Sequence, residues 1–141
     1  MANDTDTIVH EWFEQVWNRG DVGAIDRLLA DDAVVHGLKT PDGKDVRGSE
    51  GFKPMHAAFR QAFPDMRIDI EECLVDGDRM AFRCVVRGTH AGDGLGIEAT
   101  GRPVEFAGMG FIRVRDGKIA EAWNTFDFQA MSAQLAPDPA E

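Results

Sequence analysis

The sequence predicts an α+β domain in which three N-terminal helices pack on a curved antiparallel β-sheet. Three observations lead to this prediction. Apolar residues recur at the spacing of an amphipathic helix as far as residue 63, and the spacing changes to alternation from residue 68 onwards. Two short turn sequences then divide the second half of the chain into long strands. Helices grouped before strands are typical of folds in which helices cover one face of an antiparallel sheet.

The helices are predicted from their apolar stripes and from the residues at their ends. Residues 8–19 carry an apolar stripe and are followed by a glycine, which favours the end of a helix. Asp21 is placed to cap a second helix, which leads into a short apolar strand at residues 33–36. Ser49 is placed to cap a third helix, and Pro64 ends it.

Two β-hairpins and a short final helix are predicted after Pro64. In the first hairpin, Ile68, Ile70 and Leu74 are expected on the apolar face. A glycine-rich loop at residues 92–101 separates the two hairpins. The predicted strands are residues 68–74, 80–86, 104–115 and 118–126, and the predicted final helix is residues 128–135.

The register of the second hairpin predicts a space above the sheet. An Asp-Gly pair at residues 116–117 is a strong signal for a two-residue turn. Counting back from this turn places Gly110 opposite Trp123 and puts Phe106 and Asp127 on the same face. Glycines opposite an indole leave room for a ligand or another backbone. We therefore expect a cavity between this face and the helices.

The opposite face of the same hairpin is also rather apolar for a surface in water. An apolar face of this size favours association, and we expect a homodimer that buries it. The residues predicted on this face are Ala107, Met109, Phe111, Ala120, Ala122 and Phe126.

Length and composition indicate one domain and exclude several classes of protein. The chain has 141 residues and a net charge of −10, which disfavours nucleic acids and anionic membranes as partners. We expect a single domain over residues 1–141, with an ordered core at about 8–135 and a disordered tail at 136–141. No apolar run is long enough to span a membrane, the N-terminus does not resemble a signal peptide, and two cysteines without a paired motif suggest a reducing compartment. A cytoplasmic protein is the expectation.

Asp127 is the principal candidate for chemistry, and two interpretations of it stay open. A carboxylate in an apolar cavity is suited to general acid/base catalysis because burial raises its pKa. Asp is also a favoured N-cap, and residues 128–135 form the helix it would cap. The absence of Tyr from the chain excludes any mechanism that depends on a phenol.

The histidines are candidates for positioning a polar substrate. His36, His56 and His90 are expected on elements that face the cavity, although a purely structural role is the commoner case for such histidines. The four histidines of the chain show no spacing typical of a metal site, so no metal is expected. Trp17 and Asn18, at the end of the first helix, could line one wall of the pocket.

Several short motifs, in their order and spacing, resemble the SnoaL-like polyketide cyclase family. The similarity extends from about Ile8 to Leu135. It implies the cone-shaped fold of nuclear transport factor 2, usually dimeric, with a cavity between the helices and the curved sheet. The motifs are Trp17-Asn18-Arg19-Gly20-Asp21, Leu29-Ala30-Asp31-Asp32, Phe63-Pro64-Asp65, Gly88-Thr89-His90 and Gly117-Lys118-Ile119-Ala120-Glu121-Ala122-Trp123, followed by Asp127.

The resemblance also implies a function. In the cyclases of this family, an aspartate at the end of the last long strand is the acid/base for aldol ring closure without a metal or cofactor, and by position this is Asp127. The strand facing it lacks the polar partners that the cyclases have there. We therefore predict a cofactor-independent cyclase or isomerase acting on a hydrophobic carbonyl compound, with Asp127 assisted by His90 and His36. The predicted substrate-binding residues are Trp17, Asn18, His56, Phe59, Phe106 and Trp123.

Two alternatives accompany this prediction. The first is a non-catalytic protein that binds an apolar small molecule in the same cavity, with Asp127 serving only as a helix cap. The second is epoxide hydrolysis on the same fold, which is disfavoured because the forms of that activity on this fold use a Tyr and an Asp-Arg-Asp set that this chain lacks.

Overall fold

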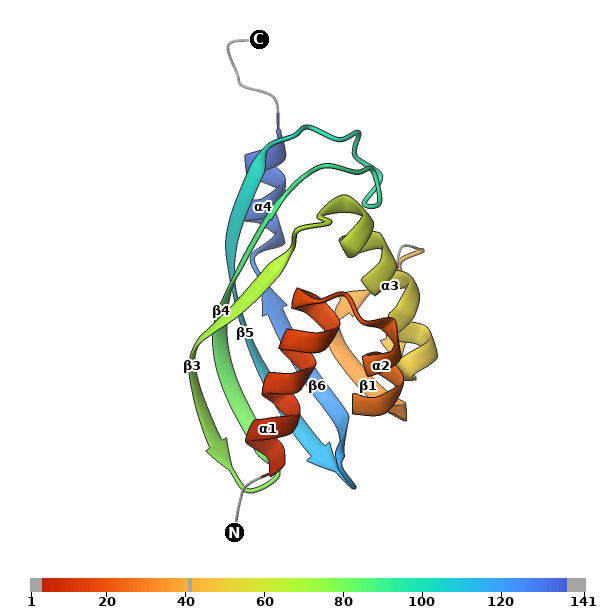
Figure 1. The fold of residues 1–141 in the computed structure, drawn as a ribbon, viewed down its shortest axis with the longest axis vertical. Helices are drawn as coiled ribbons and strands as arrows, with labels where there is room; N and C mark the ends of the chain where they lie inside the picture. Colours follow the sequence, from red (N-terminus) through yellow and green to blue (C-terminus); the bar gives the residue numbers. More distant parts are fainter. Residues whose placement is uncertain (1–3, 41, 137–141) are drawn as a thin grey trace.

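Helices precede the main strands in the computed structural model, which describes residues 4–40 and 42–136 and confirms the predicted α+β class (Figure 1). A fourth, C-terminal helix follows the last strand, as predicted. The elements are α1 Asp4–Glu11, the π-helix η1 Trp12–Asn18, α2 Val22–Leu28, β1 Leu29–Lys39, β2 Asp45–Arg47, α3 Gly48–Ala62, β3 Arg67–Asp76, β4 Arg79–Thr89, β5 Pro103–Arg115, β6 Lys118–Phe126 and α4 Phe128–Leu135.

The strands form one curved sheet, and helices α1, α2 and α3 lie on the same side of it (Figure 1). The strand order is β2-β1-β6-β5-β4-β3, and every pair except one is antiparallel. Strand β1 runs parallel to β6, so the prediction of a wholly antiparallel sheet is corrected. After β1 the chain passes through β2 and α3 to β3 at the far edge of the sheet. The last strand, β6, lies beside β1 and runs in the same direction.

The first helical segment is longer than predicted. It begins at Asp4, and its second half winds as a π-helix in which the N–H of Arg19 donates to the carbonyl of Glu14 at 2.9 Å. Gly20 ends it with a φ of +69°, a conformation that glycine adopts without strain. The four apolar side chains of this π-helix, Trp12, Phe13, Val16 and Trp17, are all buried.

The predicted helix caps are corrected, although both helices are confirmed. Asp21 occupies the N-cap position of α2, but its carboxylate pairs with Arg27 at 3.2 Å instead of accepting from the helix backbone. Ser49 lies inside α3, which starts one residue earlier, and its hydroxyl donates to Oδ1 of Asp31 at 3.3 Å. Asp21 thus pairs with the last turn of its own helix, and Ser49 bonds to strand β1.

A β-bulge in β6 changes which side chains face the helices. Arg115 pairs with Lys118 as predicted, but Ala120 is an extra residue between the pairs Val114–Ile119 and Arg113–Glu121. An inserted residue moves every later side chain to the other face of the sheet. The predicted register is therefore wrong beyond the bulge, and Gly110 lies opposite Asn124, not Trp123.

The space expected above the glycines of β5 is filled by aromatic rings. A Cβ at Gly108 would stand 2.3 Å from the ring of Phe126, and one at Gly110 would stand 2.4 Å from the ring of Phe82. These distances are shorter than any van der Waals contact. The glycines therefore admit neighbouring rings to the core and do not form an open site.

A second bulge reorients the edge strand β3. Ile70 pairs with Cys84 and Glu72 pairs with Arg83, which leaves Glu71 as the inserted residue. Beyond it Cys73 packs against the core and Leu74 points away with 74% of its surface exposed. The predicted apolar face of Ile68, Ile70 and Leu74 is corrected at Leu74 for this reason.

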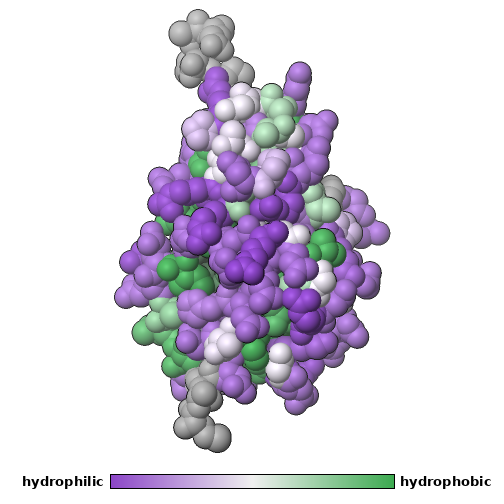
Figure 2. Space-filling model, in the orientation of Figure 1, coloured by the Kyte–Doolittle hydropathy of each residue, from purple (hydrophilic) through white to green (hydrophobic). Residues whose placement is uncertain are grey.

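The surface in Figure 2 is mostly hydrophilic, with smaller hydrophobic patches on its lower half, where α1 and β3 lie in Figure 1. Residues 137–141 of the predicted disordered tail lie outside the described residues, and α4 ends at Leu135 as predicted. Within residues 4–40 and 42–136, no helix is long and apolar enough to cross a membrane.

Candidate ligand cavity

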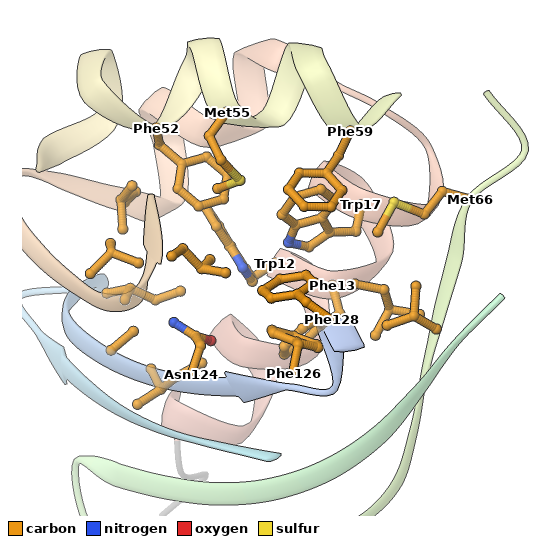
Figure 3. A pocket seen from close by; sticks show the side chains of 18 of the residues that line it. Trp12, Phe13, Trp17, Phe52, Met55, Phe59, Met66, Asn124, Phe126 and Phe128 are labelled. Carbon is orange, nitrogen blue, oxygen red and sulfur yellow. The ribbon is translucent and has the colours of Figure 1, made fainter. Parts of the chain in front are cut away.

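An apolar cavity of about 40 Å³ lies between the helices and the inner face of the sheet (Figure 3). Aromatic rings from η1, α3 and the start of α4 close it on several sides. The lining residues are Trp12, Phe13, Trp17, Leu29, Val35, Leu38, Phe52, Met55, Phe59, Met66, Ile68, Val86, Phe106, Ile112, Ile119, Ala122, Asn124, Phe126 and Phe128.

Only three lining side chains carry a nitrogen or oxygen atom. Asn124 extends from β6 towards the aromatic rings, and its Nδ2 donates to the carbonyl of His36 at 3.1 Å (Figure 3). Its Oδ1 has no partner among the described residues. The indole N–H groups of Trp12 and Trp17 likewise have no acceptor in the described part of the chain. The cavity thus offers one amide and two indole donors within an apolar wall.

A larger outer cleft of about 750 Å³ adjoins the cavity. It lies among the end of β1, α3, the loop at residues 93–97 and α4, and it has some polar lining, including Lys39, Asp93 and Ser132. A volume of this size suits a small organic ligand, whereas the inner cavity has room for only one or a few water molecules.

Four side chains line both spaces and separate them: Leu38, Met55, Phe59 and Phe128. The rings of Phe59 and Phe128 have centroids 5.8 Å apart. Both phenylalanines are only half-buried, while the leucine and the methionine are buried. Movement of the two rings would join the inner cavity to the outer cleft.

Three of the predicted substrate-binding residues line the cavity. Trp17 comes from η1, Phe59 from α3 and Phe106 from β5. The first two lie on the buried faces of their helices. Phe106 belongs to β5, which keeps its predicted alternation because the bulge lies on the opposite strand.

Asp127 caps α4 and does not line the cavity. Its Oδ1 accepts a hydrogen bond from the N–H of Ala130 at 2.9 Å, and the residue is exposed. Phe126 and Phe128, its neighbours in sequence, both line the cavity, but the Asp127 carboxylate is not among the lining groups. The capping interpretation is confirmed, and the acid/base role stays a prediction.

His36 and Trp123 lie on the outer face of the sheet. Nε2 of His36 is 2.8 Å from Oε2 of Glu121, and the other carboxylate oxygen of Glu121, Oε1, accepts from Arg113. The structure therefore places these two predicted site residues together, but on the face away from the cavity. The position of Trp123 follows from the bulge at Ala120.

His90 is completely buried at the base of the glycine-rich loop. The backbone N–H of Thr100 donates to its Nδ1 at 3.2 Å, so that nitrogen is an acceptor and the proton is on Nε2. Among the residues that the structure describes, Nε2 has no hydrogen-bond partner. His90 does not line the cavity, and its ring lies 5.5 Å from that of Phe63.

His56 and Asn18 hold the first helical segment in place. Nε2 of the buried His56 is 2.7 Å from the carbonyl of Val16. Burial lowers the pKa of His56 below its ordinary value, the charge of Arg60 lowers it further, and the bond to Val16 opposes them. Asn18 accepts from the N–H of Ile68 at 2.6 Å and donates to its carbonyl at 3.1 Å. Neither residue lines the cavity.

Asn124 lines the cavity but is not among the predicted site residues. Regular alternation from the Asp116-Gly117 turn places Trp123 on the cavity face, and the bulge at Ala120 brings Asn124 there instead. Ile119 and Ala120 are consecutive apolar residues, and both are buried. Such a pair within an alternating strand is the signal that could have indicated the bulge.

The fold and the cavity define a class of protein: a cone of helices and curved sheet around an apolar pocket, as in nuclear transport factor 2. The family model for SnoaL-like polyketide cyclases matches residues 7–135. The chain belongs to the SnoaL-like polyketide cyclase family. No curated protein matches the chain.

Solved structures show the same fold. Wild-type IdmH from Streptomyces antibioticus, a proposed polyketide cyclase, is 33% identical, with a TM-score of 0.78 over 93% of this chain and 97% of that chain. AclR from Streptomyces galilaeus, a proposed hydroxylase, is 26% identical, with a TM-score of 0.79 over 96% and 83%. A proposed SnoaL-like cyclase from Jannaschia sp. is 21% identical, with a TM-score of 0.81 over 96% and 94%, and this likeness concerns the fold alone.

Proposed function

We propose that the chain binds a hydrophobic carbonyl compound in the cone and promotes ring closure or isomerisation through its enolate, without a cofactor. The observation that carries this proposal is a pair of unpartnered indole N–H donors, those of Trp12 and Trp17, in an apolar cavity that also holds the amide of Asn124. Developing negative charge on a carbonyl oxygen is stabilised by fixed donors, and more strongly where water is excluded. Apolar walls also hold a flexible substrate in a folded shape.

The substrate enters through the outer cleft. The outer cleft has about 750 Å³, while the inner cavity has only about 40 Å³ in the described conformation. Binding therefore requires Phe59 and Phe128 to move, which merges the two spaces. Polar groups of the substrate remain in the outer cleft, beside Lys39 and Asp93.

Asp127 is the proposed general base. Its place in the sequence between two cavity-lining residues, Phe126 and Phe128, supports this role, as does the resemblance to the cyclases. To act, the carboxylate must rotate away from the N–H of Ala130 and towards the substrate. Catalytic hydrogen bonds are often loose before a substrate binds. His36 and His90 have no part in this proposal, since His36 lies with Trp123 on the outer face of the sheet and His90 is completely buried.

A non-catalytic binding protein is the second candidate function. It is favoured by one observation, which is that no carboxylate lines the inner cavity in the described part of the chain, while Asp127 is occupied as a cap. The two candidates differ in whether a bound ketone loses a proton. A test of proton transfer therefore separates them.

Proton exchange at the carbon next to a carbonyl measures enolate formation directly. A methyl naphthyl ketone in D₂O serves as the probe, and NMR follows deuterium incorporation. The proposal expects the wild type to accelerate exchange and Asp127→Asn to reduce the acceleration by about 10²–10⁴-fold. Asn is also a good N-cap, so this variant keeps the helix. Acceleration that is equal in the variant overturns the role of Asp127.

Binding is followed separately by tryptophan fluorescence. The chain has three Trp residues, and in a Trp123→Phe background the two remaining indoles are those of the cavity. The ketone is expected to quench their emission in a saturable way. Binding without any acceleration of exchange establishes the second candidate function, and the absence of both overturns the cavity as the site.

We further propose a homodimer formed through the outer face of the sheet. An apolar row crosses four neighbouring strands through the paired residues Leu74, Ala81, Phe111 and Trp123. Leu74 is 74% exposed, Phe111 37% and Trp123 38%, and Met109, on the same face, is 61% exposed. A contiguous apolar surface of this kind favours burial against a second copy.

A further inference from the structure

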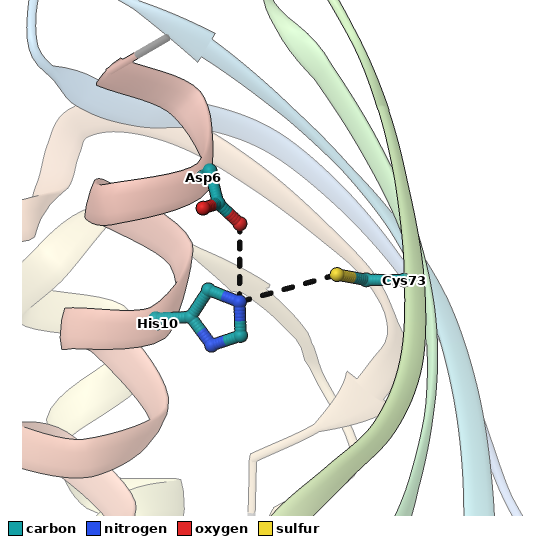
Figure 4. A group of neighbouring side chains, drawn as sticks. All are labelled: Asp6, His10 and Cys73. Atoms are coloured by element: carbon teal, nitrogen blue, oxygen red, sulfur yellow. Dashed lines mark hydrogen bonds and ion pairs between the residues drawn. The ribbon is translucent and has the colours of Figure 1, made fainter. Parts of the chain in front are cut away.

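Three potential metal ligands meet on the outside of the cone, away from the cavity (Figure 4). Asp6 and His10 are one turn apart on α1, and Cys73 comes from the edge strand β3. One ligand atom from each residue lies within 4.8 Å of the other two. Cys73 is far from the other two in sequence, which is why no spacing motif indicated the group.

The three ligand atoms converge on one point. Nε2 of His10 is 3.1 Å from Oδ1 of Asp6 and 4.0 Å from Sγ of Cys73. A catalytic Cys-His-Asp triad needs the thiol and the carboxylate on different ring nitrogens, so this geometry excludes one. A metal ion, by contrast, requires all three ligand atoms to point towards a common centre, as they do in Figure 4.

The distances are close to those of a zinc site. Zinc bonds of about 2.0 Å to nitrogen or oxygen and about 2.3 Å to sulfur place neighbouring tetrahedral ligands roughly 3.3–3.8 Å apart. The observed His10–Asp6 and His10–Cys73 distances of 3.1 and 4.0 Å lie on either side of that range. Imidazole with thiolate is a ligand combination that suits zinc better than magnesium or calcium.

The fold holds the ligands next to each other before any ion arrives. The bulge at Glu71 turns Cys73 towards α1, since without it Leu74 would face the helix. The hydroxyl of Thr5 donates to the carbonyl of Gly77 at 2.8 Å, which fixes the first turn of α1 against the hairpin of β3 and β4. The His10 and Asp6 side chains are 48% and 53% exposed, so an ion has open access.

We propose that Asp6, His10 and Cys73 form a zinc-binding site that joins α1 to the edge of the sheet. A water molecule supplies the fourth ligand. On binding, a bond forms between zinc and Sγ as the thiol proton leaves to solvent. His10 binds the ion as the tautomer that carries its proton on Nδ1, which leaves the lone pair of Nε2 free for the metal. The site is independent of the proposed enzymatic function.

Zinc titration of the full chain without an affinity tag, in competition with a chromophoric chelator, tests the proposal. We expect one zinc ion per chain and an affinity at least about tenfold weaker in Cys73→Ser and in His10→Gln. The matched control is His36→Gln, which removes another exposed histidine that pairs with a carboxylate, at 2.8 Å, but has no cysteine beside it. This variant should bind zinc like the wild type.

Cobalt binding and alkylation test whether Cys73 coordinates the ion. Bound Co²⁺ should give a thiolate charge-transfer absorption that is lost in Cys73→Ser, and zinc should protect Cys73 from iodoacetamide. Cys84 is the internal control, since burial raises the pKa of its thiol to about 12 and keeps it unreactive with or without the ion. Equal zinc affinity in the wild type and Cys73→Ser, or alkylation that zinc does not slow, overturns the site.

Discussion

The imidazole of His36 stacks on the indole of Trp123, with ring centroids 5.1 Å apart and planes 16° from parallel. The pair joins β1 to β6 on the face of the sheet that points away from the cavity. Two residues that were predicted to act on a substrate therefore belong to a surface, and that surface is the one proposed to bury a second copy of the chain.

Replacing Trp123 with Glu should separate the proposed dimer. A carboxylate buried in an apolar interface has no compensating partner, and Glu121 already supplies negative charge nearby. Light scattering after size-exclusion chromatography is expected to show a dimer for the wild type and a monomer for the variant. Val22→Glu is the matched control, because Val22 is 50% exposed on α2, away from this face. A wild-type chain that is already monomeric contradicts the proposal.

Acidification should destabilise the fold through His56. Its pKa is lowered in the folded state, first by burial, while the unfolded chain has an ordinary value of about 6.5. Between these two values the unfolded chain binds a proton that the folded chain does not. Stability is therefore retained above about pH 6.5 and falls below it, by at most about 1.4 kcal/mol per pH unit.

Urea unfolding at pH 7.5 and pH 5.5 measures this dependence. His56→Gln should remove it, since the amide can still donate to the carbonyl of Val16 but does not titrate. The quantity to compare between the two proteins is the change in the free energy of unfolding from pH 7.5 to pH 5.5. If the wild type and the variant lose the same stability on acidification, His56 is not the responsible group.

Asp127→Ala should weaken the fold where Asp127→Asn does not. The hydrogen bond from Ala130 to the carboxylate caps α4, and loss of such a cap costs about 1 kcal/mol. Asn is an equally good cap, so the two variants separate the structural role from the proposed proton transfer. Denaturant midpoints provide the measurement, and equal midpoints for wild type and Asp127→Ala would show that the cap does not contribute.

Gly110→Ala should destabilise the sheet by about 1–3 kcal/mol because a Cβ there would overlap the ring of Phe82 at 2.4 Å. Gly51→Ala is the control, since a Cβ on this residue of α3 meets nothing within 4 Å. Alanine in a helix interior is favoured over glycine by about 0.5–1 kcal/mol. The two substitutions are thus expected to shift the thermal midpoint in opposite directions.

The sequence predicted the fold well because its signals are local. Gly20 and the Asp116-Gly117 turn require positive φ angles, of +69°, +54° and +79°, and such residues mark helix ends and hairpin turns directly. The apolar stripe that contains Trp17 follows from helical spacing alone. Family motifs then identified the cone without any knowledge of side-chain contacts.

The site was less predictable because it depends on single inserted residues. A break in alternation as slight as the apolar pair Ile119-Ala120 is easily overlooked, and the bulge at Ala120 puts Asn124 in the cavity in place of the predicted Trp123. The bulge at Glu71 similarly turns Cys73 towards the core, where Leu74 was predicted. Contacts such as His10 with Cys73 also join residues far apart in sequence, and only the folded chain brings them together.

The two margins of the sheet have a consequence for how the protein avoids aggregation. One margin is β2, which is only three residues long, and the other is β3, which is interrupted by the bulge at Glu71. Short and irregular margins offer few consecutive backbone groups to an incoming strand. Amyloid-like growth by strand addition is therefore discouraged at both ends, while the broad apolar row of the sheet remains open to a partner that docks face to face.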